Sequence, residues 1–234
     1  MTAVVLRELS GIAELKQSEA VQRAVWGEDD PPDNADLMLA LQSEGGLVAG
    51  AFRGGRMVGF LLAFPSATPG VQHSHRLAVL PEARGLGLGP RLQWFQRNWC
   101  LARGIGRVRW TFDPARRVNA RLNVLALGGE AGVYLRDHYG PMAGINAGLP
   151  SDRLLLEWEL DSPAVQARAR GLPPPPITAA LRVPIPEAIE AQVAADPGAA
   201  LAARLALREA LEAAFARGLR IRGLEPDGSA YLLG

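Results

Sequence analysis

The stretch HSHRLAVLPEARGLGLGPRL, residues 73–92, decides how this chain is interpreted. An apolar strand ends at Leu77–Leu80, Pro81 stops it, and closely spaced glycines then lead into a helical pattern. Glycines between a strand and a helix let backbone N–H groups converge on an anion, because no Cβ stands in the way. The helix adds its unpaired first amides and the positive end of its dipole. The stretch therefore predicts a phosphate-binding loop; the alternative is a glycine-rich turn that only connects two elements.

Two well-known phosphate loops do not fit this stretch. A Walker A loop ends in Gly-Lys-Ser or Gly-Lys-Thr, whereas here the glycines lead to Gly89-Pro90-Arg91. A dinucleotide fingerprint spaces its last two glycines more widely than Gly87 and Gly89, and it requires an acidic residue after the next strand. The corresponding strand here, residues 107–110, is basic. The loop is therefore expected to bind a different phosphate group.

The loop resembles the Arg/Gln-x-x-Gly-x-Gly/Ala motif of the GNAT superfamily of acyl-CoA N-acyltransferases. Arg84, Gly87 and Gly89 fill the pattern, and Leu77–Pro81 is similar to the strand that leads into it. The resemblance implies acyl-CoA as cosubstrate, acetyl-CoA or succinyl-CoA, with its pyrophosphate on main-chain amides. The loop residues implied to bind the cofactor are Arg84, Gly85, Leu86, Gly87, Leu88, Gly89 and Pro90.

The order of elements along residues 4–160 also resembles the GNAT fold. Apolar patterns predict strands at 4–9, 47–52, 57–64, up to 80, 108–112 and 154–160, and helices at 11–26, 35–42, after the loop, and at 116–127. We expect an α+β fold with a mixed central sheet. In the GNAT fold the strand before the loop and the strand at 108–112 splay apart around the pantetheine arm.

The tail differs in composition from the rest of the chain. Pro173–Pro176 forms a stiff connector, and we expect a GNAT domain at 1–160 and a small C-terminal α+β extension at 161–234 docked on it. A helix is expected to begin at Asp196-Pro197, with a closing hairpin after it. Arg204, Arg208 and Glu212 lie at helical spacing and are expected to form a solvated face.

A finer resemblance comes from four segments of the chain. They are WTFDP at 110–114, NARLN at 119–123, YG at 139–140 and SDRLLLEWEL at 151–160. Together they are similar to a bacterial subgroup of GNAT proteins with a C-terminal extension. Some members of that subgroup occur with N-acylamino-acid racemases and are thought to transfer succinyl from succinyl-CoA to amino acids.

Direct acyl transfer needs a base for the amine, a donor to the carbonyl oxygen and an acid for the leaving thiolate. His75 is the candidate base or substrate-orienting group, since histidine titrates near neutral pH. Strand alternation predicts His73 and His75 on one face and Ser74 and Arg76 on the other. The alternative for His75 is a hydrogen-bonded histidine at a strand end. No third ligand accompanies the two histidines, so no metal site is expected.

The resemblance implies further cofactor contacts. GNAT enzymes stabilise the carbonyl oxygen with a backbone N–H at a bulge, which corresponds here to about Ala78–Val79, and Leu77 belongs to the same implied set. Asn119 and Asn123 share a helix face and are assigned to the pantetheine amides, with local capping as the alternative.

The catalytic acid departs from the family pattern. Many GNAT enzymes use a tyrosine in the helix after the second splayed strand, where this chain has Ala126. Tyr134 and Tyr139 are the candidate replacements; water as the acid, and packing roles for both tyrosines, are the alternatives.

Two other groups of charged residues bear on the substrate. A substrate carboxylate would call for an arginine, and Arg76 and Arg153 are assigned to substrate binding, with Arg121 as a further candidate. An ion pair between Arg153 and the adjacent Asp152 is the alternative. The acidic loop at 27–34 is expected to be solvated, or to meet a cationic substrate group.

Bulk properties exclude several classes of protein. A net charge of +1 provides no general attraction to nucleic acid, and the single cysteine, Cys100, excludes a disulfide framework. Residues 1–20 lack the apolar core of a signal peptide, and no apolar stretch approaches the roughly 20 residues of a membrane span. We expect a cytoplasmic protein with no membrane or nucleic-acid partner.

The function that these patterns favour is transfer of an acetyl or succinyl group from acyl-CoA to the amino group of a small molecule, such as an amino acid, by direct attack in a ternary complex. A non-catalytic acyl-CoA-binding or sensing module, which the missing helix tyrosine supports, is one alternative. A protein or peptide N-acetyltransferase is another. The oligomeric state is left open, a homodimer included.

Overall fold

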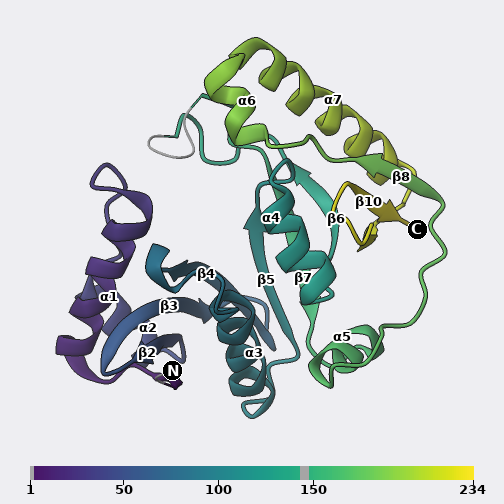
Figure 1. The fold of residues 1–234 in the computed structure, drawn as a ribbon. Coiled ribbons are helices and arrows are strands. Elements are labelled where there is room, and N and C mark those ends of the chain that lie inside the picture. The colour runs from purple at the N-terminus through teal and green to yellow at the C-terminus, as the bar shows by residue number, and fades with distance from the viewer. Residues whose placement is uncertain (1–2, 143–147) are drawn as a thin grey trace. The chain divides into compact units, whose positions relative to one another are not determined.

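The computed structural model describes residues 3–142 and 148–234 of the 234-residue chain (Figure 1). Tertiary contacts divide the chain into two compact units, residues 1–108 and residues 109–234. No helix within the described residues is long and apolar enough to cross a membrane.

The N-terminal unit is an antiparallel sheet with strand order β1-β2-β3-β4 and helices packed against it. Its strands are β1 (Val4–Glu8), β2 (Leu47–Arg53), β3 (Arg56–Pro65) and β4 (Val71–Val79). Its helices are α1 (Gly11–Trp26), α2 (Ala35–Ser43) and α3 (Leu88–Leu101), with a short 3-10 turn η1 (Pro81–Ala83) before α3.

The central strands of this unit are buried on both faces. Six of the seven residues of β2 are buried, and β3 has an equally continuous apolar run. Such runs are typical of strands covered on both sides, whereas alternation is typical of half-exposed ones. A tight hairpin turn joins β2 and β3: Gly54 and Gly55 have φ of 59° and 81°, as a two-residue type I′ turn requires.

The C-terminal unit contains strands in the order β5-β7-β6-β9-β10-β8. The strands are β5 (Arg107–Phe112), β6 (Glu130–Leu135), β7 (Arg153–Glu159), β8 (Leu181–Pro184), β9 (Ile221–Leu224) and β10 (Ala230–Leu233). The helices are α4 (Arg117–Ala120), a π-helical turn η2 (Arg121–Ala126), α5 (Pro163–Ala169), α6 (Ile189–Ala195) and α7 (Pro197–Ala216). The core of this unit includes Trp158, which is fully buried, stacks edge-on with Trp110 and donates to the carbonyl of Leu127.

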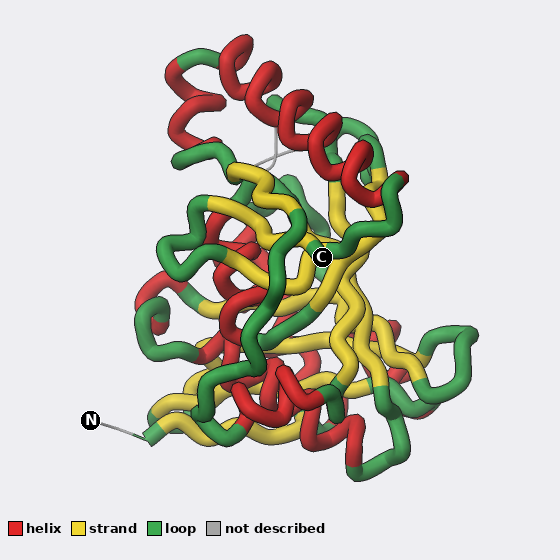
Figure 2. Tube along the Cα trace, turned by 90° about the vertical axis from the view of Figure 1, so that its right-hand side faces the viewer, coloured by secondary structure: helices red, strands yellow, loops and turns green. Residues whose placement is uncertain are grey.

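The C-terminal segment continues the sheet of this unit. β9 pairs with β6, and both β8 and β9 pair with β10. The sequence patterns did not predict β6. Helix α7, at the top of Figure 2, packs against β6 and β8. It begins as predicted, because the Asp196 side chain accepts from the amide of Ala199 and Pro197 occupies the first turn. The predicted domain boundary at residue 160 remains a prediction.

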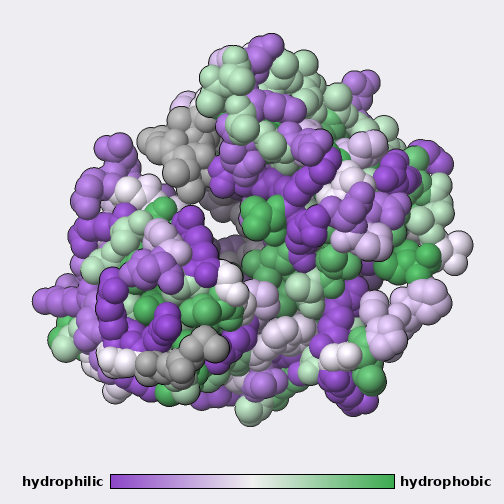
Figure 3. Space-filling view, viewed as in Figure 1, coloured by the Kyte–Doolittle hydropathy of each residue, from purple (hydrophilic) through white to green (hydrophobic). Residues whose placement is uncertain are grey.

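The outer surface of α7 is mixed in character. Leu201 and Leu205 are exposed, and Figure 3 shows hydrophobic and hydrophilic residues side by side over this helix. The opposite side of α7 carries arginines that point into the unit, as the next subsection describes.

Candidate functional site

The glycine loop connects the end of β4 and η1 to the start of α3. Gly85 and Gly87 have φ of 82° and 65°, in the left-handed region that favours glycine. Gly87 is the N-cap of α3 and offers no side chain to the first amides of the helix. This local geometry is the one that the sequence predicted for a phosphate cradle.

Only some of the loop amides are available to a ligand. The amide of Arg84 donates to Pro81 and that of Leu86 to Ala83, while Pro90 has no N–H group. The amides that have no acceptor among the residues that the structure describes are those of Gly85, Gly87, Leu88 and Gly89. Of the predicted cofactor-binding residues 84–90, four therefore have a main-chain N–H available to a ligand. The exposed side chain of Arg84 lies beside them in sequence.

The space next to these donors is open. A Cβ built on Gly85 or Gly87 meets no described atom within 4 Å, and one on Gly89 meets only Leu77, at 3.9 Å. The glycines are therefore not required by close protein packing. Both the open space and the free amides fit an anionic group that lies against the backbone.

A β-bulge displaces the second half of β4. Leu62 pairs with Arg76 and Ala63 with Ser74, so His75 is an extra residue in the ladder. The bulge expected near Ala78–Val79 does not occur in the β3–β4 ladder, where those residues pair regularly with Phe60 and Gly59. A bulge interrupts the alternation of side chains, and the prediction that Arg76 faces away from His75 is therefore wrong.

His75 and Arg76 meet the same carboxylate. The Nε2 atom of His75 lies 3.5 Å from Oδ2 of Asp33, and Nε of Arg76 lies 3.1 Å from the same oxygen. Burial raises the pKa of the Asp33 carboxyl, but His75 and the charge of Arg76 outweigh it and hold the pKa below its ordinary value. Sequence reasoning did not assign Asp33 to the site; the acidic loop at 27–34 was its only signal.

Arg76 is engaged by the loop between α1 and α2. Its Nη2 atom donates to Asp30 at 2.9 Å, and its guanidinium lies 4.7 Å above the Trp26 ring. Two carboxylates already compensate the positive charge of this guanidinium, and an aromatic ring covers it. It is therefore poorly suited to bind a substrate carboxylate. The acidic loop at 27–34 thus binds a cation of the protein itself, Arg76.

The two candidate tyrosines have different surroundings. Tyr134 donates its hydroxyl proton to Asp152 at 2.7 Å, and burial together with that carboxylate raises its pKa far above the ordinary value. Tyr139 is 52% exposed, and its hydroxyl oxygen lies 2.8 Å from Oγ1 of Thr111 on β5. Of the two candidates, Tyr139 is therefore the more exposed residue.

Asn119 and Asn123 are not equivalent. Asn123 is buried, and its Oδ1 accepts from Nε1 of Trp110 at 3.3 Å. Asn119 lies in the first turn of α4 and is partly exposed. Of the two, Asn123 is thus the one whose side chain is committed to an internal hydrogen bond.

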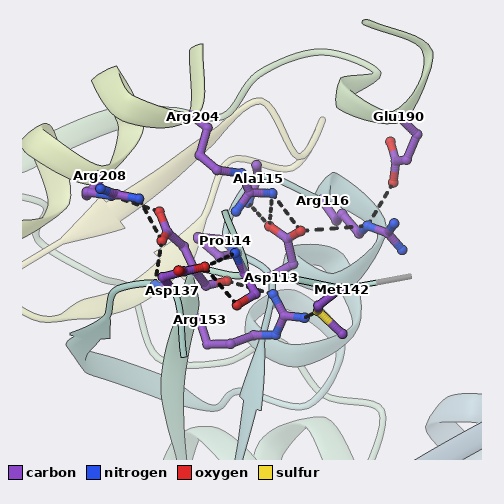
Figure 4. A network of polar contacts seen from close by, with 12 residues as sticks. Asp113, Pro114, Ala115, Arg116, Asp137, Met142, Arg153, Glu190, Arg204 and Arg208 are labelled. Carbon is purple, nitrogen blue, oxygen red and sulfur yellow. Dashed lines mark hydrogen bonds and ion pairs between the residues drawn. The ribbon is translucent and has the colours of Figure 1, made fainter. Parts of the chain in front are cut away.

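The expected ion pair between Arg153 and Asp152 is not formed. The carboxylate of Asp152 instead binds Arg208 of α7 through two hydrogen bonds, of 2.8 and 2.9 Å. The guanidinium of Arg153 instead lies beside Met142 (Figure 4). It also lies near the ring of Tyr139. A second arginine of α7, Arg204, donates to both oxygens of Asp113, at 3.0 and 2.7 Å.

The predicted solvated face of α7 is therefore a contact surface. Arg204 is only 2% exposed, Arg208 is largely covered, and Glu212 pairs with Arg136 at 2.6 Å. The prediction was wrong because helical spacing shows which side chains share a face but not what that face meets.

Cys100, the single cysteine, is fully buried on α3. Its thiol donates to Oε1 of Gln72 at 3.1 Å, and burial raises its pKa to about 12. A thiol that holds its proton at neutral pH is a poor nucleophile. Elsewhere in the described chain, no three His, Cys, Asp or Glu side chains come together as a metal-binding group.

Comparison with known proteins agrees with this geometry. The model of the acetyltransferase (GNAT) family matches residues 12–122. The ribosomal-protein-S18-alanine N-acetyltransferase of Escherichia coli aligns with 68% of this chain and 96% of its own length, with a TM-score of 0.56 and 16% identity. No curated protein matches the sequence.

Two further solved structures contain acetyl-CoA. The phosphinothricin acetyltransferase of Sinorhizobium meliloti aligns with 67% of this chain and 88% of its own, with a TM-score of 0.53 and 20% identity. A putative acetyltransferase of Salmonella typhimurium aligns with 69% and 96%, with a TM-score of 0.55 and 18% identity. These identities establish the fold alone. The family-model match over residues 12–122 and the shared fold together make this chain similar to the acetyltransferase (GNAT) family.

Proposed function

We propose that this protein is an N-acyltransferase that moves an acyl group from acyl-CoA to the amino group of a small molecule, such as an amino acid, within a ternary complex. The observation that carries the proposal is the glycine loop, where four free amides at the start of α3 border open space. The acetyl-CoA in the Salmonella and Sinorhizobium structures supports acetyl-CoA as donor. A succinyl donor remains part of the proposal.

The loop fits the cofactor through its chemistry. The amides of Gly85, Gly87, Leu88 and Gly89 supply neutral donors, and the dipole of α3 and the Arg84 side chain supply positive charge. Bound there, acyl-CoA would supply the activated thioester. Asn119 is the proposed donor or acceptor for an amide of its pantetheine arm.

His75 is the proposed base for the acceptor amine. Its Nε2 atom faces Asp33, a carboxylate that stays ionised because its pKa is lowered. A carboxylate in this position orients an imidazole and stabilises its protonated form after proton transfer. Asp33 is therefore assigned as a positioning residue.

Tyr139 is the proposed acid for the leaving thiolate. Replacement Tyr139→Phe should lower kcat about 100-fold with little change in the Kd for CoA, since only the proton donor is removed. Tyr134→Phe is the matched control, because that hydroxyl is bonded to Asp152. We expect Tyr134→Phe to lower the free energy of unfolding by about 1 kcal/mol and to leave kcat nearly unchanged.

The measurement is thiol release from acetyl-CoA and succinyl-CoA with a panel of amino acids, amines and peptides. Turnover with small amines supports the proposal, and turnover with peptides alone would replace it with a peptide acyltransferase. Tight CoA binding without any turnover would identify a non-catalytic binding module. Equal kcat losses in the two tyrosine variants would remove the assignment of Tyr139.

A further inference from the structure

Arg153 is a buried cation whose hydrogen-bond partners are neutral. It is 8% exposed, and its Nη1 and Nη2 atoms donate to the carbonyl of Asp152 at 2.8 Å and to Sδ of Met142 at 3.1 Å. Within residues 3–142 and 148–234, no carboxylate lies at ion-pair distance from it. A buried guanidinium is normally paired with an anion, because leaving it unpaired is costly.

Two aspartates flank Arg153 without pairing with it. Asp152 precedes it in sequence, and Asp113 is near enough for its charge to raise the pKa of Arg153, partly opposing the effect of burial. Asp113 is thus the carboxylate whose charge acts on Arg153, whereas Asp152 contacts Arg153 only through its main-chain carbonyl. Figure 4 shows the guanidinium of Arg204 on the Asp113 carboxylate and that of Arg153 beside Met142.

Each of these aspartates is held by an arginine of α7. Arg204 binds both oxygens of Asp113, and Arg208 binds both oxygens of Asp152. Positions 204 and 208 are one helical turn apart, so one face of one helix holds both carboxylates. The Nε and Nη1 atoms of Arg204 are buried and have no acceptor in the part of the chain that the structure describes.

Arg153 lies beside the proposed catalytic acid. Its guanidinium carbon is 5.1 Å from the centre of the Tyr139 ring, and the Tyr139 hydroxyl reaches Thr111 at the end of β5. A ligand that reached Tyr139 would thus find a cation with no carboxylate of its own. A carboxylate binds a guanidinium bidentately, more strongly than the carbonyl and thioether that Arg153 now contacts.

We propose that Arg153 binds a carboxylate of the substrate, and that Arg204 is a positioning residue that keeps Asp113 from neutralising it. The C-terminal helix would then determine substrate specificity. This inference rests on the proposed acyltransferase function. The carboxylate has two possible sources, the acceptor or a dicarboxylic acyl group, and the experiment separates them.

The first test compares ligands with and without a carboxylate. Leucine and leucinamide are used as acceptors with acetyl-CoA, and acetyl-CoA and succinyl-CoA are compared as donors. Arg153→Gln should raise KM about 10- to 100-fold for whichever partner supplies the carboxylate, with its carboxylate-free counterpart nearly unchanged. Arg153→Lys should lose less, because it keeps the charge but not the bidentate geometry.

Arg168→Gln is the matched control. Arg168 is also partly buried in this unit and donates to main-chain carbonyls, those of Leu125 and Ala164. Its loss should affect stability without changing the discrimination between ligands. If Arg153→Gln changes KM equally for both members of each ligand pair, the proposal is overturned.

The second test addresses the positioning role. Arg204→Gln frees Asp113, so it should weaken binding of the carboxylate-bearing ligand as Arg153→Gln does. Adding Asp113→Asn should restore part of that binding, because an amide cannot neutralise Arg153. A double variant that is as impaired as Arg204→Gln, with both folded by circular dichroism, would contradict the positioning role.

The inference can fail separately from the proposed function. Calorimetric Kd values for acetyl-CoA, succinyl-CoA, N-acetyl-leucine and N-acetyl-leucinamide require no turnover. If transfer is absent but Arg153→Gln selectively weakens a carboxylate-bearing ligand, the inference stands and the enzymatic proposal fails. If wild-type protein does not prefer the carboxylate-bearing member of either pair, the inference is overturned.

Discussion

The glycine loop at 84–89 and the arginine cluster around Asp113 and Asp152 recognise charge in opposite ways. The loop presents main-chain amides in a short, continuous segment whose shape depends on two left-handed glycines. The cluster brings together side chains that are 91 and 56 residues apart in the sequence, Asp113 with Arg204 and Asp152 with Arg208. Local sequence therefore describes the first region well and the second hardly at all.

The largest effect that we expect is on the stability of the cluster. Asp152 is fully buried, so Asp152→Asn leaves the Arg208 guanidinium without its anion and should lower the free energy of unfolding by about 3 kcal/mol. Glu212→Gln removes another ion pair of α7, the one between Glu212 and Arg136, whose side chain is 65% exposed. This substitution should change the free energy of unfolding by less than about 1 kcal/mol. Urea unfolding checks both, and similar losses would show that burial does not distinguish the two pairs.

The loop should respond in ligand affinity rather than in stability. Gly87→Ala forces a Cβ into the space beside the amides and should weaken CoA binding by more than about tenfold. Gly55→Ala is its control, since Gly55 also has positive φ and open surroundings but lies in the β2–β3 turn.

Both glycine variants should lose about 1 kcal/mol of stability from left-handed strain. Calorimetry with CoA gives the affinity, and thermal unfolding gives the stability. Unchanged CoA affinity in Gly87→Ala would remove the phosphate-binding role of the loop.

The smallest expected effect is the pH dependence of the cluster. Burial raises the pKa of Asp152, but hydrogen bonds from Arg208, the Asp137 amide and Tyr134 outweigh it and hold the pKa below its ordinary value. A carboxyl group whose pKa is lowered in the folded state stabilises the protein at pH values above its ordinary, unfolded-state pKa. That stabilisation is lost as the pH falls through the folded-state pKa.

Between pH 5 and pH 2.5, wild type should therefore lose on the order of 1 kcal/mol more stability than Asp152→Asn. Urea unfolding at each pH measures this difference. Parallel loss in the two proteins would mean that other carboxyl groups account for the acid sensitivity.

Sequence patterns predicted most helices and strands but not how the C-terminal strands pair with the rest of their sheet. β6 was missed because Gly128, Gly129 and Gly132 suggested a loop, although β7 and β9 both pair with this strand. β8 was missed because Pro184 and Pro186 argue against a strand, yet β8 ends the strand order, where proline is tolerated. Without β6 and β8, the C-terminal segment could only be read as a docked appendage.

The sequence by itself determined the glycine loop and its resemblance to the GNAT loop motif, because backbone geometry at closely spaced glycines depends on local residues. Only the tertiary structure decided which charges are paired. It showed Arg76 engaged by Asp30 and Asp33, Asp152 bound to Arg208, and Arg153 left with neutral hydrogen-bond partners. Ion pairing depends on which side chains a fold brings within a few ångströms, and spacing along one strand or helix does not contain that information.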